Sequence, residues 1–164
     1  APYLNEAGWL LEEGVAIETI DRALVRFGFP VGPFQLIDEV GFAVAAKAGA
    51  VVSDAFGARM APAPALRRAL ESGRPGRKGG QGFYAYASDG KRGGVDASVY
   101  AAAGLRAPRA PNGDKRGSGA NGGNGLPDQD EIVRRTVYPM LDEAVRCLDE
   151  GIVRSARDGD VGAV

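Results

Sequence analysis

Residues 13–41 read EGVAIETIDRALVRFGFPVGPFQLIDEVG, and this stretch decides the fold. Its first half carries apolar side chains three or four residues apart, the spacing of one helix face: Ile17, Ile20, Leu24 and Phe27. The segment GFPVGP at 28–33 ends that helix with two prolines and two glycines. A short helix is expected over 34–41, because Pro33 suits the first turn of a helix. The stretch therefore predicts two helices joined by a rigid apolar turn.

Further helices are expected on both sides of this stretch. Apolar spacing, with breaks at glycine or proline, predicts helices at 2–14, 42–56, 65–72 and 128–150. Asp128 followed three residues later by Glu131 is the pattern of a capping box, and Pro139 is expected to kink the helix that follows. The aromatic run at 83–86 predicts a short extended segment. The chain is thus expected to be mainly α, with at most one small hairpin.

The pattern weakens in the middle of the chain. Residues 88–127 show little periodicity apart from a turn of helix expected near 97–103, and 112–125 are a low-complexity mixture of glycine, asparagine and charge. Chains of this composition are flexible. We therefore expect a first helical domain over 1–87, a flexible glycine-rich linker over 88–127, and a further ordered unit over 128–164.

Two segments of the chain repeat each other. PYLNEAGWLLEEG at 2–14 and PMLDEAVRCLDEG at 139–151 are identical at seven of thirteen positions. Seven identities are more than helix composition gives, and the competing explanation is convergent patterning of two amphipathic helices. The repeat predicts one complete helical unit followed by the beginning of a second copy, which is interrupted at Val164. Both ends of the chain are accordingly expected to be cut from a longer protein.

Composition excludes several classes of chemistry. The 164 residues include 20 basic and 21 acidic side chains, one cysteine and no histidine. Catalysis by a Ser/His/Asp or Cys/His set, and zinc or haem held by histidine, is therefore excluded within this chain. Cys147 alone forms no internal disulfide. No apolar run reaches 18 residues, so no membrane span is expected.

Three features each allow a functional and a purely structural interpretation. The basic turn GRPGRKGGQGFY fails the phosphate-loop template, although Arg77 and Lys78 remain exposed point charges that suit an anion. The turn GFPVGPF at 28–34 is either the wall of an apolar pocket or a corner between helices, and the residues alone favour the corner. Carboxylates on the helices, Asp38 among them, either form an acid/base pair or are solvated and locally paired, and the residues alone favour the second interpretation. The basic middle of the chain lacks the interleaved aromatics of a nucleic-acid site.

The residues of 13–41, followed by GRKGGQGFYAY at 76–86, resemble the C-terminal helical domain of L-3-hydroxyacyl-CoA dehydrogenases, a fold similar to the C-terminal domain of 6-phosphogluconate dehydrogenase. The most similar form is that of the multifunctional α-subunit of fatty acid β-oxidation complexes, which carries two tandem copies of the domain separated by a variable linker. MLDEAVRCLDEGIV at 140–153 resembles the opening of the second copy. The resemblance covers 1–87 and 128–164.

This resemblance implies a reaction and a division of labour. Enzymes of the family oxidise the 3-hydroxyl of a 3-hydroxyacyl-CoA to a ketone and pass a hydride to NAD. NAD, the catalytic histidine and its glutamate partner belong to a Rossmann domain expected before this chain, and an assisting asparagine is expected before Pro2. Asn5 does not match that asparagine. The chain is thus expected to hold no catalytic residue and no metal ligand, and to be inactive alone.

The resemblance also implies contacts. The expected substrate-binding residues wall the acyl pocket or lie in the basic turn: Phe29, Pro30, Gly32, Pro33, Phe34 and Lys78. The expected partners are the acyl-CoA substrate, the Rossmann domain, a thiolase subunit and another copy of the protein. The expected location is the cytoplasm, and no nucleic-acid partner is expected. The alternative interpretation is a helical interaction or dimerisation module of another two-domain NAD enzyme, with no substrate role.

Overall fold

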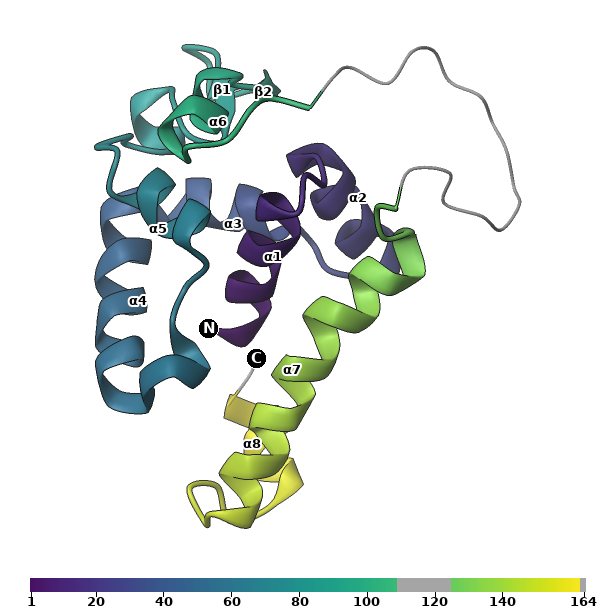
Figure 1. Ribbon diagram of the computed structural model, residues 1–164. Helices are drawn as coiled ribbons and strands as arrows, with labels where there is room; N and C mark the ends of the chain where they lie inside the picture. Colours follow the sequence, from purple (N-terminus) through teal and green to yellow (C-terminus); the bar gives the residue numbers. More distant parts are fainter. Residues whose placement is uncertain (109–124, 163–164) are drawn as a thin grey trace.

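The computed structural model describes residues 1–108 and 125–162 (Figure 1). Helices dominate, as predicted, and the sequence-based boundaries lie within two residues of the observed ones at both ends of each predicted helix. The helices, including two short 3₁₀ helices, are α1 (Pro2–Glu12), α2 (Ile17–Phe27), α3 (Pro33–Val40), α4 (Phe42–Phe56), η1 (Gly57–Met60), α5 (Pro64–Leu70), η2 (Arg77–Gly79), α6 (Ser98–Ala102), α7 (Gln129–Asp149) and α8 (Ala156–Gly162). The strands are β1 (Tyr84–Tyr86) and β2 (Arg92–Val95).

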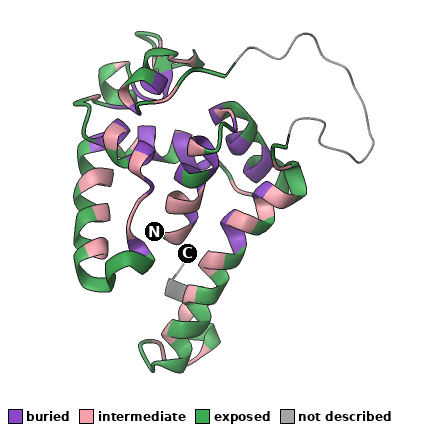
Figure 2. Cartoon of the chain, viewed as in Figure 1, coloured by how far each residue is buried: buried purple, intermediate pink, exposed green. Residues whose placement is uncertain are grey.

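Helix α1 lies at the centre of the first unit, between α4 and α7, with the hairpin and α6 at one end (Figure 1). It buries one face, which includes Tyr3, Ala7 and Leu11. Gly8 lets α5 approach closely, because a Cβ at this position would lie 2.8 Å from the Cβ of Leu66. Figure 2 shows the buried residues gathered where α1, α2, α3 and α5 meet. The apolar faces predicted from sequence spacing therefore form one core.

The linker predicted over 88–127 begins too early. Strand β2 pairs antiparallel with β1, with Tyr84 opposite Val95. Helix α6 buries Val99 and Tyr100, and the Tyr100 hydroxyl accepts a hydrogen bond of 3.2 Å from the amide of Ile17 at the start of α2. The turn of helix expected near 97–103 is present as α6, whereas β2 was assigned to the linker because few apolar side chains mark it. Most of the low-complexity segment at 112–125 lies outside the described residues.

Helix α7 begins as predicted and joins the first unit. The Asp128 side chain accepts a hydrogen bond of 2.8 Å from the amide of Glu131, which is one half of a capping box. Ile132, Thr136 and Val137 are buried against the rest of the fold. The helix continues through Pro139. The predicted boundary at 128 therefore divides a packed core, because the first turns of α7 complete the unit that precedes them.

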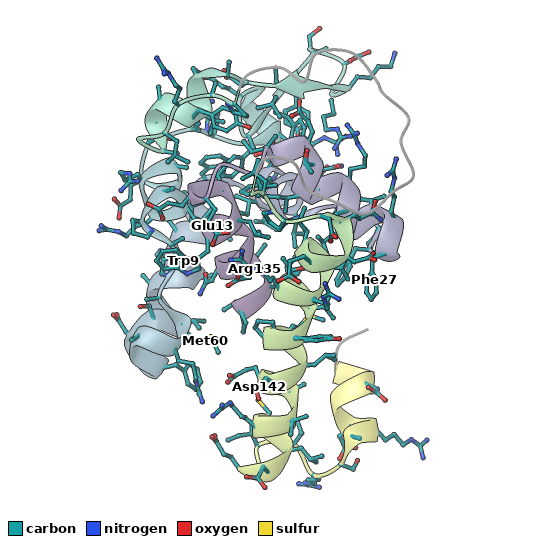
Figure 3. All side chains as sticks on the ribbon, turned by 45° about the vertical axis from the view of Figure 1, so that its right-hand side comes forward. Trp9, Glu13, Phe27, Met60, Arg135 and Asp142 are labelled. Carbon is teal, nitrogen blue, oxygen red and sulfur yellow. The ribbon has the colours of Figure 1, made fainter. Side chains whose placement is uncertain are left out.

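Arg135 fastens α7 to α1. Its guanidinium donates to Glu6 at 2.8 Å and to Glu13 at 2.8 Å. Figure 3 shows Arg135 on α7 facing Glu13 at the end of α1. One planar cation that meets two carboxylates fixes the angle at which the two helices cross more strictly than apolar contact does.

The two repeat segments end in the same way. Gly14 and Gly151 both have a positive φ, and each donates to the carbonyl three residues earlier. The next residues, Val15 and Ile152, each donate to the carbonyl five residues earlier. Val15 is buried, whereas Ile152 is 71% exposed. The local structure of the repeat is thus shared, while the packing around it is not.

Ile132→Ala is expected to lower the free energy of unfolding by about 3 kcal/mol, because it removes buried methyl groups where α7 packs on the first unit. Val145→Ala on the same helix is the matched control. Val145 is 63% exposed, so the expected change is below about 0.5 kcal/mol. Urea unfolding of both variants measures the difference, and equal effects would contradict the packing of α7 described above.

Candidate functional site

The turn predicted to wall a pocket divides into an exposed and a buried half. Phe29 is half-buried and stacks on Tyr3 with ring centroids 5.0 Å apart, and Pro30 is exposed. Phe34, in contrast, is fully buried and packs on Phe83 at 4.8 Å. Of the predicted wall, the side chains of Phe29 and Pro30 reach solvent, whereas Gly32, Pro33 and Phe34 belong to the core.

A buried carboxylate from α2 holds this turn. Asp21 accepts hydrogen bonds from the amides of Phe34 at 2.9 Å and Gln35 at 3.1 Å. Both amides lie in the first turn of α3, where backbone donors lack partners within the helix. Asp21 thus caps α3 from another helix. Gly32 leaves the necessary space, because a Cβ there would lie 2.3 Å from the Asp21 carboxyl carbon.

A second buried carboxylate holds the glycine-rich turn. Asp38 on α3 accepts hydrogen bonds from the amides of Phe83 at 2.7 Å and Tyr84 at 2.9 Å, and from the Tyr86 hydroxyl at 3.0 Å. A Cβ at Gly82 would lie 2.1 Å from one of its oxygens. The expectation that Asp38 is a solvated or locally paired carboxylate is therefore wrong. It carries polar contacts between segments more than forty residues apart.

Tyr84 joins the two carboxylates. Its amide donates to Asp38, and its hydroxyl donates to Asp21 at 2.9 Å. The apolar turn at 28–34 and the glycine-rich turn at 76–86 are consequently one physical unit. Asp21 was not predicted as a functional or anchoring residue. The signal for it is an acidic residue inside an otherwise apolar helix face, between Ile20 and Leu24.

Burial changes the acidity of both aspartates. Loss of hydration raises the pKa of Asp21 to about 6, although hydrogen bonds from Phe34, Tyr84 and Gln35 act in the opposite direction. Burial also raises the pKa of Asp38, against the hydrogen bonds from Phe83, Tyr84 and Tyr86. Every oxygen of the two carboxylates accepts at least one hydrogen bond from within the fold. Their arrangement is that of structural anchors.

The basic turn at 76–86 lines a polar pocket of about 560 Å³. Glu39 accepts hydrogen bonds of 2.6 and 2.8 Å from Arg77, which leaves that guanidinium neutralised. Lys78 is exposed, and the described part of the chain gives it no ion pair. The residues that line this pocket include none from the turn at 28–34. The structure therefore joins the two motifs through the core but does not bring Lys78 and Phe29 into one cavity.

Part of the basic charge in the middle of the chain is paired with the acidic helices. Arg68 meets Glu12 at 3.5 Å and Arg59 meets Glu143 at 3.3 Å. Within 1–108 and 125–162, no three acidic or sulfur side chains gather closely enough to hold a metal ion. No helix in these ranges is long and apolar enough to cross a membrane. Among the described residues, the site thus offers the apolar side chains of Phe29 and Pro30 and the unpaired ammonium group of Lys78.

The arrangement of helices has a counterpart among solved structures. The crystal structure of the dehydrogenase part of multifunctional enzyme 1 from C. elegans matches with a TM-score of 0.65 and 22% sequence identity, over 92% of this chain and 31% of that one. This likeness shows that the two chains share a fold over the matched part.

The sequence then gives the family. Residues 1–86 match the family model described as 3-hydroxyacyl-CoA dehydrogenase, C-terminal domain. The fatty acid oxidation complex subunit alpha of Shewanella sp. strain ANA-3 is 45% identical over 168 residues, and that of Shewanella oneidensis is 44% identical over 164. Each match covers 100% of this chain and 21% of the relative. The chain belongs to the 3-hydroxyacyl-CoA dehydrogenase family, as a C-terminal domain, which confirms the resemblance seen in its motifs.

Gly82→Ala is expected to lower the free energy of unfolding by about 3 kcal/mol, because the added methyl group must displace the Asp38 carboxylate. Gly94→Ala is the matched control, since a Cβ at Gly94 meets nothing within 4 Å. Its expected effect is within about 0.5 kcal/mol. Chemical denaturation of the two variants compares them, and a Gly82→Ala chain as stable as Gly94→Ala would refute the close approach.

The raised pKa of Asp21 makes stability depend on pH in a specific direction. In the folded chain its pKa is about 6, above the ordinary value of 3.8. The folded state therefore holds the proton longer, and stability from this group falls as pH rises from 4 to 7. Relative to Asp21→Asn, the chain should lose about 3 kcal/mol over this interval. Unfolding measured at several pH values tests this, and a relative gain would mean that the carboxylate is stabilised as an anion.

Proposed function

We propose that this chain is the helical substrate-pocket and packing domain of an NAD-dependent L-3-hydroxyacyl-CoA dehydrogenase that acts in fatty acid β-oxidation. The observation that carries the proposal is the 45% identity to fatty acid oxidation complex alpha subunits across the whole chain. The chain spans 21% of the length of these relatives. Activity, substrate and partners are therefore properties of the complete protein, to which this domain contributes surfaces.

This domain contributes a preformed apolar wall. Phe29 and Pro30 are held at the surface by the stack on Tyr3 and by the Asp21 cap behind the turn. A wall of this kind orients an acyl chain and excludes water from the reacting carbon. Lys78, the free cation of the polar pocket, supplies a contact for an anionic part of the CoA thioester.

The hydride acceptor lies elsewhere in this proposal. NAD, when bound to the complete protein, would supply the oxidant for the substrate. The described residues do not fit it, because their one sheet is the antiparallel pair β1–β2 and lacks the parallel strand–helix–strand unit of a dinucleotide site. We assign NAD, the catalytic histidine and its glutamate partner to a Rossmann domain outside this chain. We also propose that the complete protein acts in the cytoplasm. Its proposed protein partners there are a thiolase subunit and further copies of the same protein.

The second part of the chain is proposed to begin another copy of the domain. The half of α7 that repeats α1 carries apolar side chains exposed to solvent, including Leu141, Val145 and Leu148. The corresponding face of α1 is buried by the helices that follow it. Further helices of a second copy would cover α7 in the same way.

Phe29→Ala in the complete protein is expected to lower kcat/KM for 3-hydroxybutyryl-CoA about tenfold, because the apolar wall beside the substrate is lost. Phe34→Ala would mainly test folding, since Phe34 lies in the core. Oxidation rates are followed by NADH absorbance. Residues 1–164 alone are expected to show no turnover.

Phe56→Ala is the matched control, because Phe56 is an exposed aromatic on α4, away from the turn. Its kcat/KM is expected to stay within about twofold of the unaltered protein. Unchanged kinetics in Phe29→Ala would instead favour a helical interaction module without a substrate role. Turnover by residues 1–164 alone would contradict the assignment of catalysis to another domain.

A further inference from the structure

The polar pocket at the basic turn carries more positive than negative charge. Arg77, Lys78 and Glu39 are the charged side chains that line it. The other residues that line it are neutral: Gly79, Gly80, Tyr86, Ala87, Ser88 and Gly90. The pocket holds about 560 Å³, which lies within the range of about 300–1,000 Å³ usual for small-molecule sites. A pocket of this charge and size suits an anionic group that a larger molecule carries.

Glu39 occupies only one corner of the Arg77 guanidinium. Both of its carboxylate oxygens accept from Nη1, at 2.6 and 2.8 Å. In the part of the chain that the structure describes, no group accepts a hydrogen bond from Nε or Nη2 of Arg77. A Cβ at Gly90 would lie 3.9 Å from Nη2, so a side chain there would lie against this edge. The Nε–Nη2 edge is a forked donor of the kind that binds two oxygens of one anion.

The core behind the pocket fixes its shape. The Tyr86 ring lies below Arg77, with 6.0 Å between its centroid and the guanidinium carbon, and its hydroxyl donates to Asp38 at 3.0 Å. Gly79 lies so close to Pro75 that a Cβ would come within 2.2 Å of the proline ring. The basic turn is therefore held in place before a ligand arrives, which lowers the ordering cost of binding.

We propose that this pocket binds a phosphate group at the nucleotide end of the CoA thioester, through the Lys78 ammonium group and the Nε–Nη2 edge of Arg77. The inference rests on the proposed function and extends it from the acyl group to the opposite end of the substrate. The charged lining favours phosphate, and no residue of the turn at 28–34 belongs to it. A CoA thioester carries its acyl group at one end and its phosphates at the other, so two separate sites match the two ends.

Lys78→Gln in the complete protein tests the assignment. The KM for 3-hydroxybutyryl-CoA is expected to rise about fivefold at unchanged kcat, because a phosphate contact far from the reacting carbon is equal in the ground state and the transition state. The N-acetylcysteamine thioester of 3-hydroxybutyrate has no nucleotide end, and its KM is expected to stay within about twofold. Lys47→Gln is the matched control, because Lys47 is an exposed cation on α4 that does not line the pocket. It should leave both KM values unchanged.

Glu39→Gln gives a test of opposite sign. It removes the negative charge that faces the ligand, so the KM for 3-hydroxybutyryl-CoA is expected to fall by about twofold. An anionic ligand requires that the two variants, each of which removes one charge, shift this KM in opposite directions. Shifts in the same direction would overturn the assignment.

A free phosphate ion is the other source of the same chemistry, and inhibition separates the two. Adenosine 3′,5′-bisphosphate is expected to compete with 3-hydroxybutyryl-CoA, with an inhibition constant about fivefold higher in Lys78→Gln. Inorganic phosphate at the same concentration is expected not to compete. Equal inhibition by inorganic phosphate, or an inhibition constant for the nucleotide that Lys78→Gln leaves unchanged, would overturn the assignment to the nucleotide end.

Failure of the pocket assignment and failure of the proposed function give different results. If the unaltered protein oxidises neither thioester, the proposed function fails. If it oxidises both, and Lys78→Gln leaves the KM of the CoA thioester unchanged or raises both KM values equally, the pocket assignment alone is overturned.

Discussion

The structure depends on two carboxylates that are buried inside a helical core. A buried charge destabilises a fold unless donors replace its lost water. Asp21 and Asp38 each accept three hydrogen bonds, from the start of α3 and from the aromatic run 83–86, which includes β1. Gly32 and Gly82 provide the space in which the carboxylates fit. This requirement explains why the proline-rich turn and the glycine-rich turn occur together: each supplies donors or space that the other needs.

The hydrogen bonds of Asp21 also fix side chains at the surface. Because the turn at 28–34 is fixed from behind by Asp21, its outer residues are held in one position rather than folding inward with Phe34. A preformed apolar wall costs little ordering when a ligand binds. Such a wall suits the proposed role of a domain that positions a substrate for reacting groups on another part of the protein.

The sequence predicted the helices well, since apolar spacing and glycine or proline breaks are local signals. It did not predict the roles of residues whose partners are distant in the chain. Asp38 resembles a surface carboxylate until Phe83 and Tyr84 are brought to it, and Phe34 resembles a pocket residue until it packs on Phe83. Residues 88–108 were assigned to the linker because their attachment depends on a few side chains such as Tyr100. The two motifs, at 28–34 and 76–86, were recognisable in the sequence. The reason that they occur together lies in contacts between distant parts of the chain.

The central claim is that Asp21, Tyr84 and Asp38 bind the two turns into one unit. Amide hydrogen exchange tests it most directly, because the carboxylates accept from backbone amides in both turns: Phe34, Gln35, Phe83 and Tyr84. The four amides are expected to open together, with free energies of opening that agree within about 0.5 kcal/mol. Opening of Phe83 and Tyr84 at a much lower free energy, while Phe34 and Gln35 stay protected, would show that the two turns are held independently.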